Sequence, residues 1–511
     1  MLQTQKTAVN MMANIMNYAV LTVLNLVVRS VFNRTLGLTA AGLDTFFKSA
    51  VSFLSLAEMG MSTGLLYKLY RPVNQKDYQK IAQVMHFYRT ASYIICGVIV
   101  FAGTVLCFCI HFMIRDGYSA FFTGSIFFFY VLDTGVSYLC AHKRALFNAS
   151  QKGYVLHLYH CGTQTVMTVL QVAVLYLLGR RQLYWGFLLF AVIKVVLRWA
   201  ENLVISRKFN RLYRDKLPTG CRLPGDEKTA VLRNVGAMFC HRIRWFCANM
   251  SASLMIPMLV SATVNGIYGN YTLITSTLLS LTDSVFSAIG VTFGGLYVSC
   301  DRDYVKNRFD SILLLNYFLY SFFACSVFNL LPPFIKLWLG AGSPLFDTGT
   351  FLLILLSFYL TGMRKTLNMA RDSAGLYSPD KKPAVFEGIC VIAFSILLGQ
   401  FFGLNGILLG GIFSAVIPYI CCPLIVYRLI LKAPVRGFYL RFCLYAVLTA
   451  SLAAFTWFLC SLLPFSGLFA FLCKGVLCCL IPNAVNGLIF YRTKEFHYLK
   501  ETIKTILRRS K

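Results

Sequence analysis

The stretch Asn33–Tyr78 reads NRTLGLTAAGLDTFFKSAVSFLSLAEMGMSTGLLYKLYRPVNQKDY. Its segment near 45–67 is long and apolar enough to cross a bilayer, which takes about 20 mostly apolar residues. Lys48 and Glu58 lie inside this segment, and Lys68, Arg71 and Lys76 follow it. A long apolar run that ends in a cluster of cations predicts a membrane span followed by a cytoplasmic loop.

The composition extends this reading to the whole chain. Of the 511 residues, 58% are hydrophobic, and Lys and Arg outnumber Asp and Glu by 48 to 19. The mean hydropathy is +0.66. Long apolar runs follow one another almost to the end, so we expect one polytopic, all-α integral membrane protein. No soluble domain remains that could carry a nucleic-acid-binding surface, so a nucleic-acid partner is not expected.

Fourteen spans are predicted, and the distribution of cations supports an even number. Lys and Arg concentrate in every second gap between the apolar runs, as expected if those gaps and both termini are cytoplasmic. Only Gly403 and its neighbours separate the spans near 384–403 and 405–431, so one broken span is an alternative there. The predicted spans lie near 9–33, 45–67, 90–114, 118–141, 154–178, 183–206, 235–261, 267–298, 309–331, 345–366, 384–403, 405–431, 438–462 and 466–491.

A faint internal repeat predicts two lobes. LSLAE at Leu54–Glu58 recurs as LSLTD at Leu279–Asp283, and Gly42-Leu43 recurs as Gly266-Ile267. Six predicted spans separate the copies, so the lobes would have the same orientation, with a site between them. We therefore expect an N-lobe at 1–206, a basic cytoplasmic linker at 207–234, a C-lobe at 235–431, two further spans at 432–491 and a basic amphipathic tail at 492–511.

Charged residues inside the spans are the candidate functional residues, because a charge at the bilayer centre costs about 2.5–3.5 kcal/mol on insertion scales. Arg29 and Lys48 are predicted to lie in the outer half of the first lobe, and His241, Arg242 and Arg244 near the inner face. Arg presents a fixed fork to phosphate and Lys a point charge. These cations thus favour a phosphate-headed substrate. The alternative for Arg29 and Lys48 is snorkelling to the interface.

Other intramembrane polar residues have less specific interpretations. Asn25 shares a helix face with Arg29 and suits sugar hydroxyls, or else it is a hydrogen-bonding contact between helices. Lys194 and Arg198 are expected to snorkel or to pair with Glu201, and Lys474 is expected to be structural. Three acids are candidates for ion coupling or for structural pairing: Glu58, Asp133 and Asp283.

The sequence gives little support for catalysis or for a bound cofactor. It lacks GxSxG, HExxH and a glycine-rich phosphate loop in a plausible context. The 18 cysteines show neither CxxC spacing nor spacing with His that would indicate a metal site. We therefore expect a protein that is not an enzyme and that has no cofactor or metal, with coupling to H⁺ or Na⁺ left open.

The stretch Asn33–Tyr78 resembles the opening of Wzx-type oligosaccharide flippases of the multidrug/oligosaccharidyl-lipid/polysaccharide exporter superfamily. The shared features are Arg34, Leu36 and Gly37, then Gly42, and then the run Leu54–Gly60. The resemblance implies a V-shaped, MATE-like arrangement of two six-helix lobes plus two C-terminal helices. It also implies a multi-pass protein of the bacterial inner membrane, with both termini in the cytoplasm.

The resemblance further implies a function, which is flipping of undecaprenyl-pyrophosphate-linked oligosaccharide repeat units from the inner to the outer leaflet by alternating access. Its partners would be that lipid-linked oligosaccharide, membrane lipids and the polysaccharide polymerase machinery. A cation-coupled multidrug exporter and a lipid II flippase of the same superfamily are the alternatives. A polymerase or ligase fits less well, because such enzymes generally carry a large outer loop and all the predicted outer loops are short.

Overall fold

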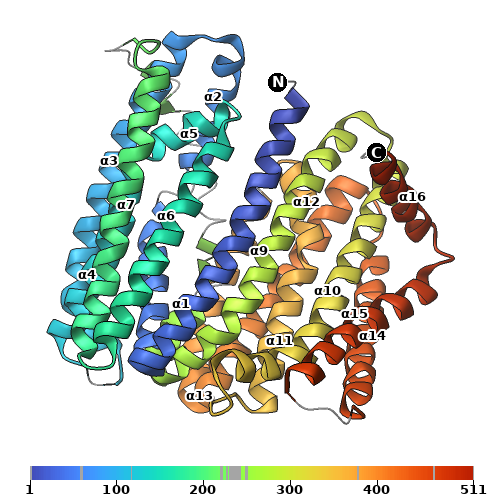
Figure 1. Cartoon of the computed structure of the whole chain (residues 1–511). Coiled ribbons are helices and arrows are strands. Elements are labelled where there is room, and N and C mark those ends of the chain that lie inside the picture. The colour runs from blue at the N-terminus through green and yellow to red at the C-terminus, as the bar shows by residue number, and fades with distance from the viewer. Residues whose placement is uncertain are drawn as a thin grey trace. The chain divides into compact units, whose positions relative to one another are not determined.

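The computed structural model describes residues 3–57, 61–116, 118–218, 223–225, 228–229, 243–244, 246–247, 251–376, 379–463 and 467–509. Every regular element in these ranges is helical (Figure 1), which confirms the predicted all-α class. Ten of the described helices are long and apolar enough to cross a membrane. The chain is therefore a multi-pass membrane protein.

Between residues 3 and 213, the described part of the chain contains seven α-helices and short helical turns between them. They are α1 (Gln3–Leu54), α2 (Met61–Gln75), α3 (Tyr78–Cys109), α4 (Ala120–Tyr138), α5 (Ala141–Ala149), α6 (Gly153–Val174) and α7 (Leu183–Tyr213). The turns are η1 (Ser55–Ala57), η2 (Ile110–Met113) and η3 (Leu175–Gly179). Helices α3, α4 and α7 pack side by side (Figure 1).

The other helices for which the structure gives bounds lie between residues 262 and 509. They are α9 (Ala262–Ser299), α10 (Arg302–Leu339), α11 (Thr348–Met363), α12 (Lys365–Ser373), α13 (Lys381–Ile425), η4 (Val426–Leu431), α14 (Arg436–Ser461), α15 (Gly467–Phe490) and α16 (Lys494–Arg509). Helix α10 contacts α11, α14, α15 and α16, and many of its residues are buried. It is the central helix of this part.

Helix α1 reverses direction at Gly37, so it supplies two antiparallel segments. Gly37 has φ 85° and ψ 173°, a conformation that glycine adopts without a steric penalty. The Arg29 guanidinium donates to the carbonyl of Ala41 at 3.0 Å, although a straight helix would place residues 12 positions apart about 18 Å from each other. The two predicted spans on either side of Gly37 are thus two packed segments of one hairpin.

Helix α13 contains a second reversal, at Gly403, where φ is 56° and ψ is −129°. The Ser395 hydroxyl on one side of the turn donates to the Ile407 carbonyl on the other side at 3.1 Å. A Cβ added at Gly406 would overlap the carbonyl of Leu398, so small residues let the two segments approach closely. The two segments are therefore antiparallel, which favours two spans over the alternative of a single broken span at 384–431.

These reversals make the described helices consistent with 14 spans. Each of the two hairpins contributes two membrane segments, and α7 is a further long helix. The predicted span near 235–261 is described only in part, at 243–244, 246–247 and 251–261.

The chain divides into two compact units, Met1–Gly269 and Asn270–Lys511. The division falls inside α9, so the first turns of α9 belong to the N-terminal unit. The lobe limits expected from the repeat, 1–206 and 235–431, remain a prediction.

The two copies of the repeated glycine meet inside the N-terminal unit. A Cβ on Gly42 would overlap the carbonyl of Ala262, and one on Gly266 would overlap that of Leu38. The hydroxyls of Thr39 and Thr263, which are 224 positions apart, lie 2.7 Å from each other. Gly42 and Gly266 are separated by the same offset (266 − 42 = 224). Contacts between corresponding residues are expected where a local two-fold axis relates the two copies of the motif.

Candidate functional site: a cation-rich cluster around Asp44

A cation-rich site in the described part of the N-terminal unit centres on Asp44, a residue that the sequence reasoning overlooked. Asp44 is 4% exposed and lies on the second segment of α1. Its carboxylate is 2.7 Å from Lys48 Nζ, 3.5 Å from Lys194 Nζ and 3.8 Å from Arg29 Nη1. The Tyr130 hydroxyl donates to it at 2.5 Å. Three cations therefore surround one carboxylate, and the cluster carries a formal charge of +2.

Arg29 is held rigidly in this cluster. Its guanidinium donates to the carbonyl of Ala41 at 3.0 Å and to that of Gly266 at 2.8 Å, and Thr45 Oγ1 lies 3.4 Å away. A Cβ on Gly269 would come within 2.6 Å of Arg29 Nη2, so glycine leaves room for the guanidinium. Arg29 thus points inward and ties both segments of α1 to the start of α9. Arg29 therefore does not snorkel to the membrane interface.

Lys194 reaches the same carboxylate from α7. Its ammonium group lies 4.2 Å from the centre of the Tyr130 ring and 4.6 Å from that of Phe190. These contacts combine a salt bridge with two cation–π interactions, and they leave the side chain 13% exposed. The expectation that Lys194 snorkels or pairs with Glu201 is therefore wrong, because the tertiary fold brings Asp44 within reach.

Lys48 is the accessible member of the cluster. Its side chain is 58% exposed, whereas the other residues of 41–51 are buried or half-buried. Thr45 and Ser52 lie one turn to either side of it and are half-buried. The stripe around Lys48 is thus polar, whereas a lipid-facing stripe would be apolar. A polar stripe is expected to face a hydrated path.

A second ion network lies further along α7, and in it the arginines and the carboxylates are equal in number. Arg198 contacts Asp133 at 3.0 Å and Glu201 at 3.3 Å, which confirms the expected pairing of Arg198 with Glu201. Arg144 adds a contact to Glu201 at 3.1 Å, and His160 Nδ1 lies 3.5 Å from the same carboxylate. The candidate acid Asp133 is therefore part of an ion pair.

The other candidate residues differ in how they are placed, and some lie outside the described residues. Asn25 is exposed on the first segment of α1, and Arg244 is 6% exposed. Glu58, His241 and Arg242 lie outside the described residues. The inner group of cations, His241, Arg242 and Arg244, therefore stays a prediction.

Several charged residues of the C-terminal unit form ion pairs, in which one cation contacts one or two carboxylates. Arg364 contacts Glu387 at 2.7 Å, and both side chains are buried. The candidate acid Asp283 is 67% exposed and pairs with Lys365, which is 7% exposed. Arg371 pairs with the fully buried Asp380. No excess of cations arises in these pairs.

Asp44 escaped notice because it lies one residue before the predicted span at 45–67. One signal was available, since Asp44 precedes Lys48 by four residues and an i,i+4 pair of opposite charges shares a helix face. The contacts to Lys194 and Tyr130 join residues 150 and 86 positions apart, and no local pattern indicates them.

Comparison with known proteins identifies the fold. No protein-family model matches the chain, and no curated protein matches it. A solved structure described as lipid II flippase MurJ in an inward closed conformation matches with a TM-score of 0.63 and 13% identity, over 94% of this chain and 98% of that one. A multidrug resistance MATE family transporter of the MOP superfamily, inward-facing, matches with a TM-score of 0.57 and 12% identity, over 80% and 95%.

A third structure is described as a MOP superfamily transporter from Pyrococcus furiosus with a reverse polarity of its binding pocket. It matches with a TM-score of 0.56 and 13% identity, over 84% of this chain and 97% of that one. At these identities the likeness establishes the fold. The chain has the fold of MurJ and the MATE transporters.

Proposed function

We propose that the chain is a flippase for a lipid with an anionic pyrophosphate head, specifically an undecaprenyl-pyrophosphate-linked oligosaccharide repeat unit. The observation that carries the proposal is the charge excess at Asp44. Arg29, Lys48 and Lys194 exceed the single carboxylate by two charges, and Lys48 is exposed. An exposed intramembrane cation beside a saturated acid favours an anionic ligand.

The three cations would have different roles. Arg29 is buried and Lys194 is 13% exposed, and both keep the field of the cluster positive, while Lys48 is accessible to a phosphate oxygen. Asn25, exposed on the same helix, would hydrogen-bond to sugar hydroxyls. His241, Arg242 and Arg244 would receive the pyrophosphate at the inner end. Alternating access would then carry the head group from the inner to the outer leaflet.

A cation-coupled drug exporter is less well supported by the same geometry. Such an exporter needs a carboxylate that can release and bind H⁺ or Na⁺. Asp44 is surrounded by three cations and a tyrosine hydroxyl, which stabilise its ionised form. The described acids Asp133, Glu201, Asp283 and Glu387 are also paired with cations.

The lipid II flippase is the second candidate, and it is favoured by the extent of the likeness to MurJ, which covers 94% of this chain. Both candidates would move a lipid-linked anionic glycan, and both would place the protein in the bacterial inner membrane with cytoplasmic termini. Polysaccharide polymerase machinery would be a partner only of the oligosaccharide flippase.

Deletion of the gene in a strain without redundant flippases tests the proposal. We expect lipid-linked repeat units to accumulate on the inner leaflet, where a glycosidase added outside the inner membrane does not reach them. Surface polysaccharide should fall in parallel. Normal surface polysaccharide in that strain would contradict the proposal. Rescue of a strain depleted of its lipid II flippase would assign the chain to the second candidate.

A further inference from the structure

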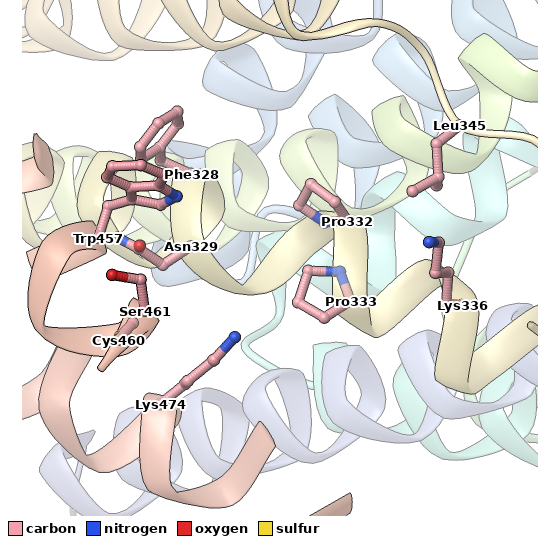
Figure 2. Close-up of a pocket in the computed structure, with 10 residues that line it drawn as sticks. All are labelled: Phe328, Asn329, Pro332, Pro333, Lys336, Leu345, Trp457, Cys460, Ser461 and Lys474. Carbon is pink, nitrogen blue, oxygen red and sulfur yellow. The ribbon is translucent and has the colours of Figure 1, made fainter. Parts of the chain in front are cut away.

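The C-terminal unit contains a cavity lined by two lysines. None of the ion-paired residues described above lines it. Its volume is about 340 Å³, and it is formed by the C-terminal half of α10, the end of α14 and the first part of α15 (Figure 2). Lys336 comes from α10 and Lys474 from α15. In Figure 2, Lys474 points toward α10, and Lys336 lies at the other end beside Leu345.

Neither lysine has a carboxylate partner among the described residues. The remaining lining side chains of the cavity are neutral. Lys474 lies seven residues after the start of α15 at Gly467, which places it about 10 Å along the helix. An ammonium group at that depth in an apolar helix is costly unless an anion or water accompanies it. Lys336 is exposed and lies in the last turn of α10.

The same cavity presents hydrogen-bond acceptors. Asn329 is 7% exposed, and its Oδ1 has no hydrogen-bond partner, while its Nδ2 donates to the carbonyl of Cys325. Pro332 and Pro333 lie inside α10 and have no amide hydrogen, so the carbonyls of Phe328 and Asn329 lose their usual helical donors. The cavity therefore suits a ligand that has both an anionic group and hydroxyl donors.

An apolar groove adjoins this cavity. Its volume is about 850 Å³, and it is formed by α10, α11 and α14. Phe328 and Trp457 line both spaces. Apart from two threonines and Tyr359, the groove is lined by Ala, Leu, Phe and Trp. A polar cavity with two cations that continues into an apolar groove matches the two parts of a lipid.

We propose that the C-terminal unit binds one anionic glycerophospholipid of the phosphatidylglycerol type. Its phosphate would contact Lys474, with Lys336 adding attraction at the far end of the cavity. A glycerol hydroxyl would donate to Asn329 Oδ1. An acyl chain would pass Trp457 and lie in the groove between α11 and α14. The site is made entirely from the C-terminal unit and shares no residue with the Asp44 cluster.

Charge complementarity indicates which lipid would occupy the cavity and the groove. Two ammonium groups without a carboxylate select an anionic head over a zwitterionic one, and the groove selects a lipid over a soluble phosphate. The ends of α10 and α14 and the start of α15 lie on the side predicted to be external. The ligand would accordingly come from the outer leaflet, where it would join α10, α14 and α15 through one head group.

The test uses the full-length protein, purified and stripped of lipid, with phosphatidylglycerol added back and binding followed by native mass spectrometry. Phosphatidylglycerol should bind at least about tenfold more tightly than phosphatidylcholine. Lys474→Gln should remove most of this preference, and Lys336→Gln should remove a smaller part of it. Lys382→Gln is the matched control, because it removes an exposed lysine of the same unit outside the cavity. It should leave binding unchanged.

A second variant tests the groove without altering either lysine. Ala450 is exposed within the groove, so Ala450→Phe fills it at little cost to folding. We expect this variant to lose long-chain phosphatidylglycerol. If Lys474→Gln does not fold, Lys336→Gln and Ala450→Phe still decide the question.

Three results would overturn the proposal. One is equal binding of phosphatidylcholine, and another is an equal loss of binding in Lys382→Gln. The third is binding of inorganic phosphate or a polyprenyl phosphate as tightly as phosphatidylglycerol, which would indicate a soluble anion or the transported lipid as the occupant.

Discussion

The Asp44 cluster of the N-terminal unit and the ion pairs of the C-terminal unit accommodate charged side chains in membrane helices in different ways. Around Asp44, three cations share one carboxylate. In the C-terminal unit, Arg364 has Glu387 and Lys365 has Asp283. Both arrangements place charges in membrane helices, where an unpaired charge is costly. Only the first leaves a net charge, and its exposed member is Lys48.

The difference separates ion pairs that hold helices together from a site that is incomplete without an anion. The internal repeat sharpens this point. At the offset of 224 positions that relates Thr39 to Thr263, Asp44 and Lys48 correspond to Tyr268 and Thr272. The second copy of the motif thus has no ion at these positions, and the charge excess belongs to the first copy.

The largest expected effect is that of Asp44→Asn. It leaves the buried Arg29 and the mostly buried Lys194 without their anion, and an uncompensated buried charge costs about 3–5 kcal/mol. We expect most of the folded protein to be lost in a fluorescence size-exclusion assay. Asp303→Asn, at an exposed carboxylate in the first turn of α10, is the control. Adding Lys194→Met to Asp44→Asn should recover part of the folded protein, and the absence of recovery would contradict the cluster.

The next effect is that of Glu387→Gln, which leaves Arg364 as a buried cation and should cost about 3 kcal/mol. The double variant Arg364→Met/Glu387→Met removes the whole pair and should be close to the wild type in thermal stability. Transport per folded molecule should remain unchanged in this double variant. A large loss of transport at normal stability would show that the pair has more than a structural role.

Lys48→Gln should affect transport and leave folding intact. Because the side chain is mostly exposed, the folded amount should match the wild type. Transport of the lipid-linked substrate should fall at least about tenfold, which corresponds to about 1.4 kcal/mol. Lys216→Gln, an exposed lysine after α7, is the control for loss of one positive charge. Full transport by Lys48→Gln would remove the functional distinction between the two regions.

The smallest effect is expected for Asp283→Asn. Asp283 is 67% exposed, so solvent screens its attraction to Lys365, and an exposed pair contributes about 1 kcal/mol or less. Lys365 keeps its hydrogen bond to the carbonyl of Leu279. Thermal unfolding should shift by a few degrees at most. A loss of stability as large as that of Asp44→Asn would show that side-chain exposure does not predict the size of the effect at these sites.

The C-terminal tail illustrates how far local pattern reaches. Its alternation of apolar and basic residues predicts an amphipathic helix, and α16 spans Lys494–Arg509. An amphipathic helix with a basic face is typical of a segment that lies on an anionic membrane surface. In the structure, the Phe496 ring lies 6.0 Å from that of Phe318, and Glu495 contacts Arg441 at 3.3 Å. The start of the helix is thus docked on α10 and α14, which only the tertiary fold could specify.

The sequence by itself determined the class of the protein and the position of most membrane segments. Apolar length and the placement of cations are local properties, and the bilayer imposes them on any helix that crosses it. Glycine at 37 and 403 also marked both reversals, because positive φ favours that residue.

Only the tertiary structure decided which charges belong together. Arg29 reaches Gly266 across 237 positions, and Lys194 reaches Asp44 across 150. These partners are set by how antiparallel helices pack, and side chains that meet in this way leave no period in the sequence. A list of intramembrane cations therefore became a site only when folding placed three of them around one buried carboxylate.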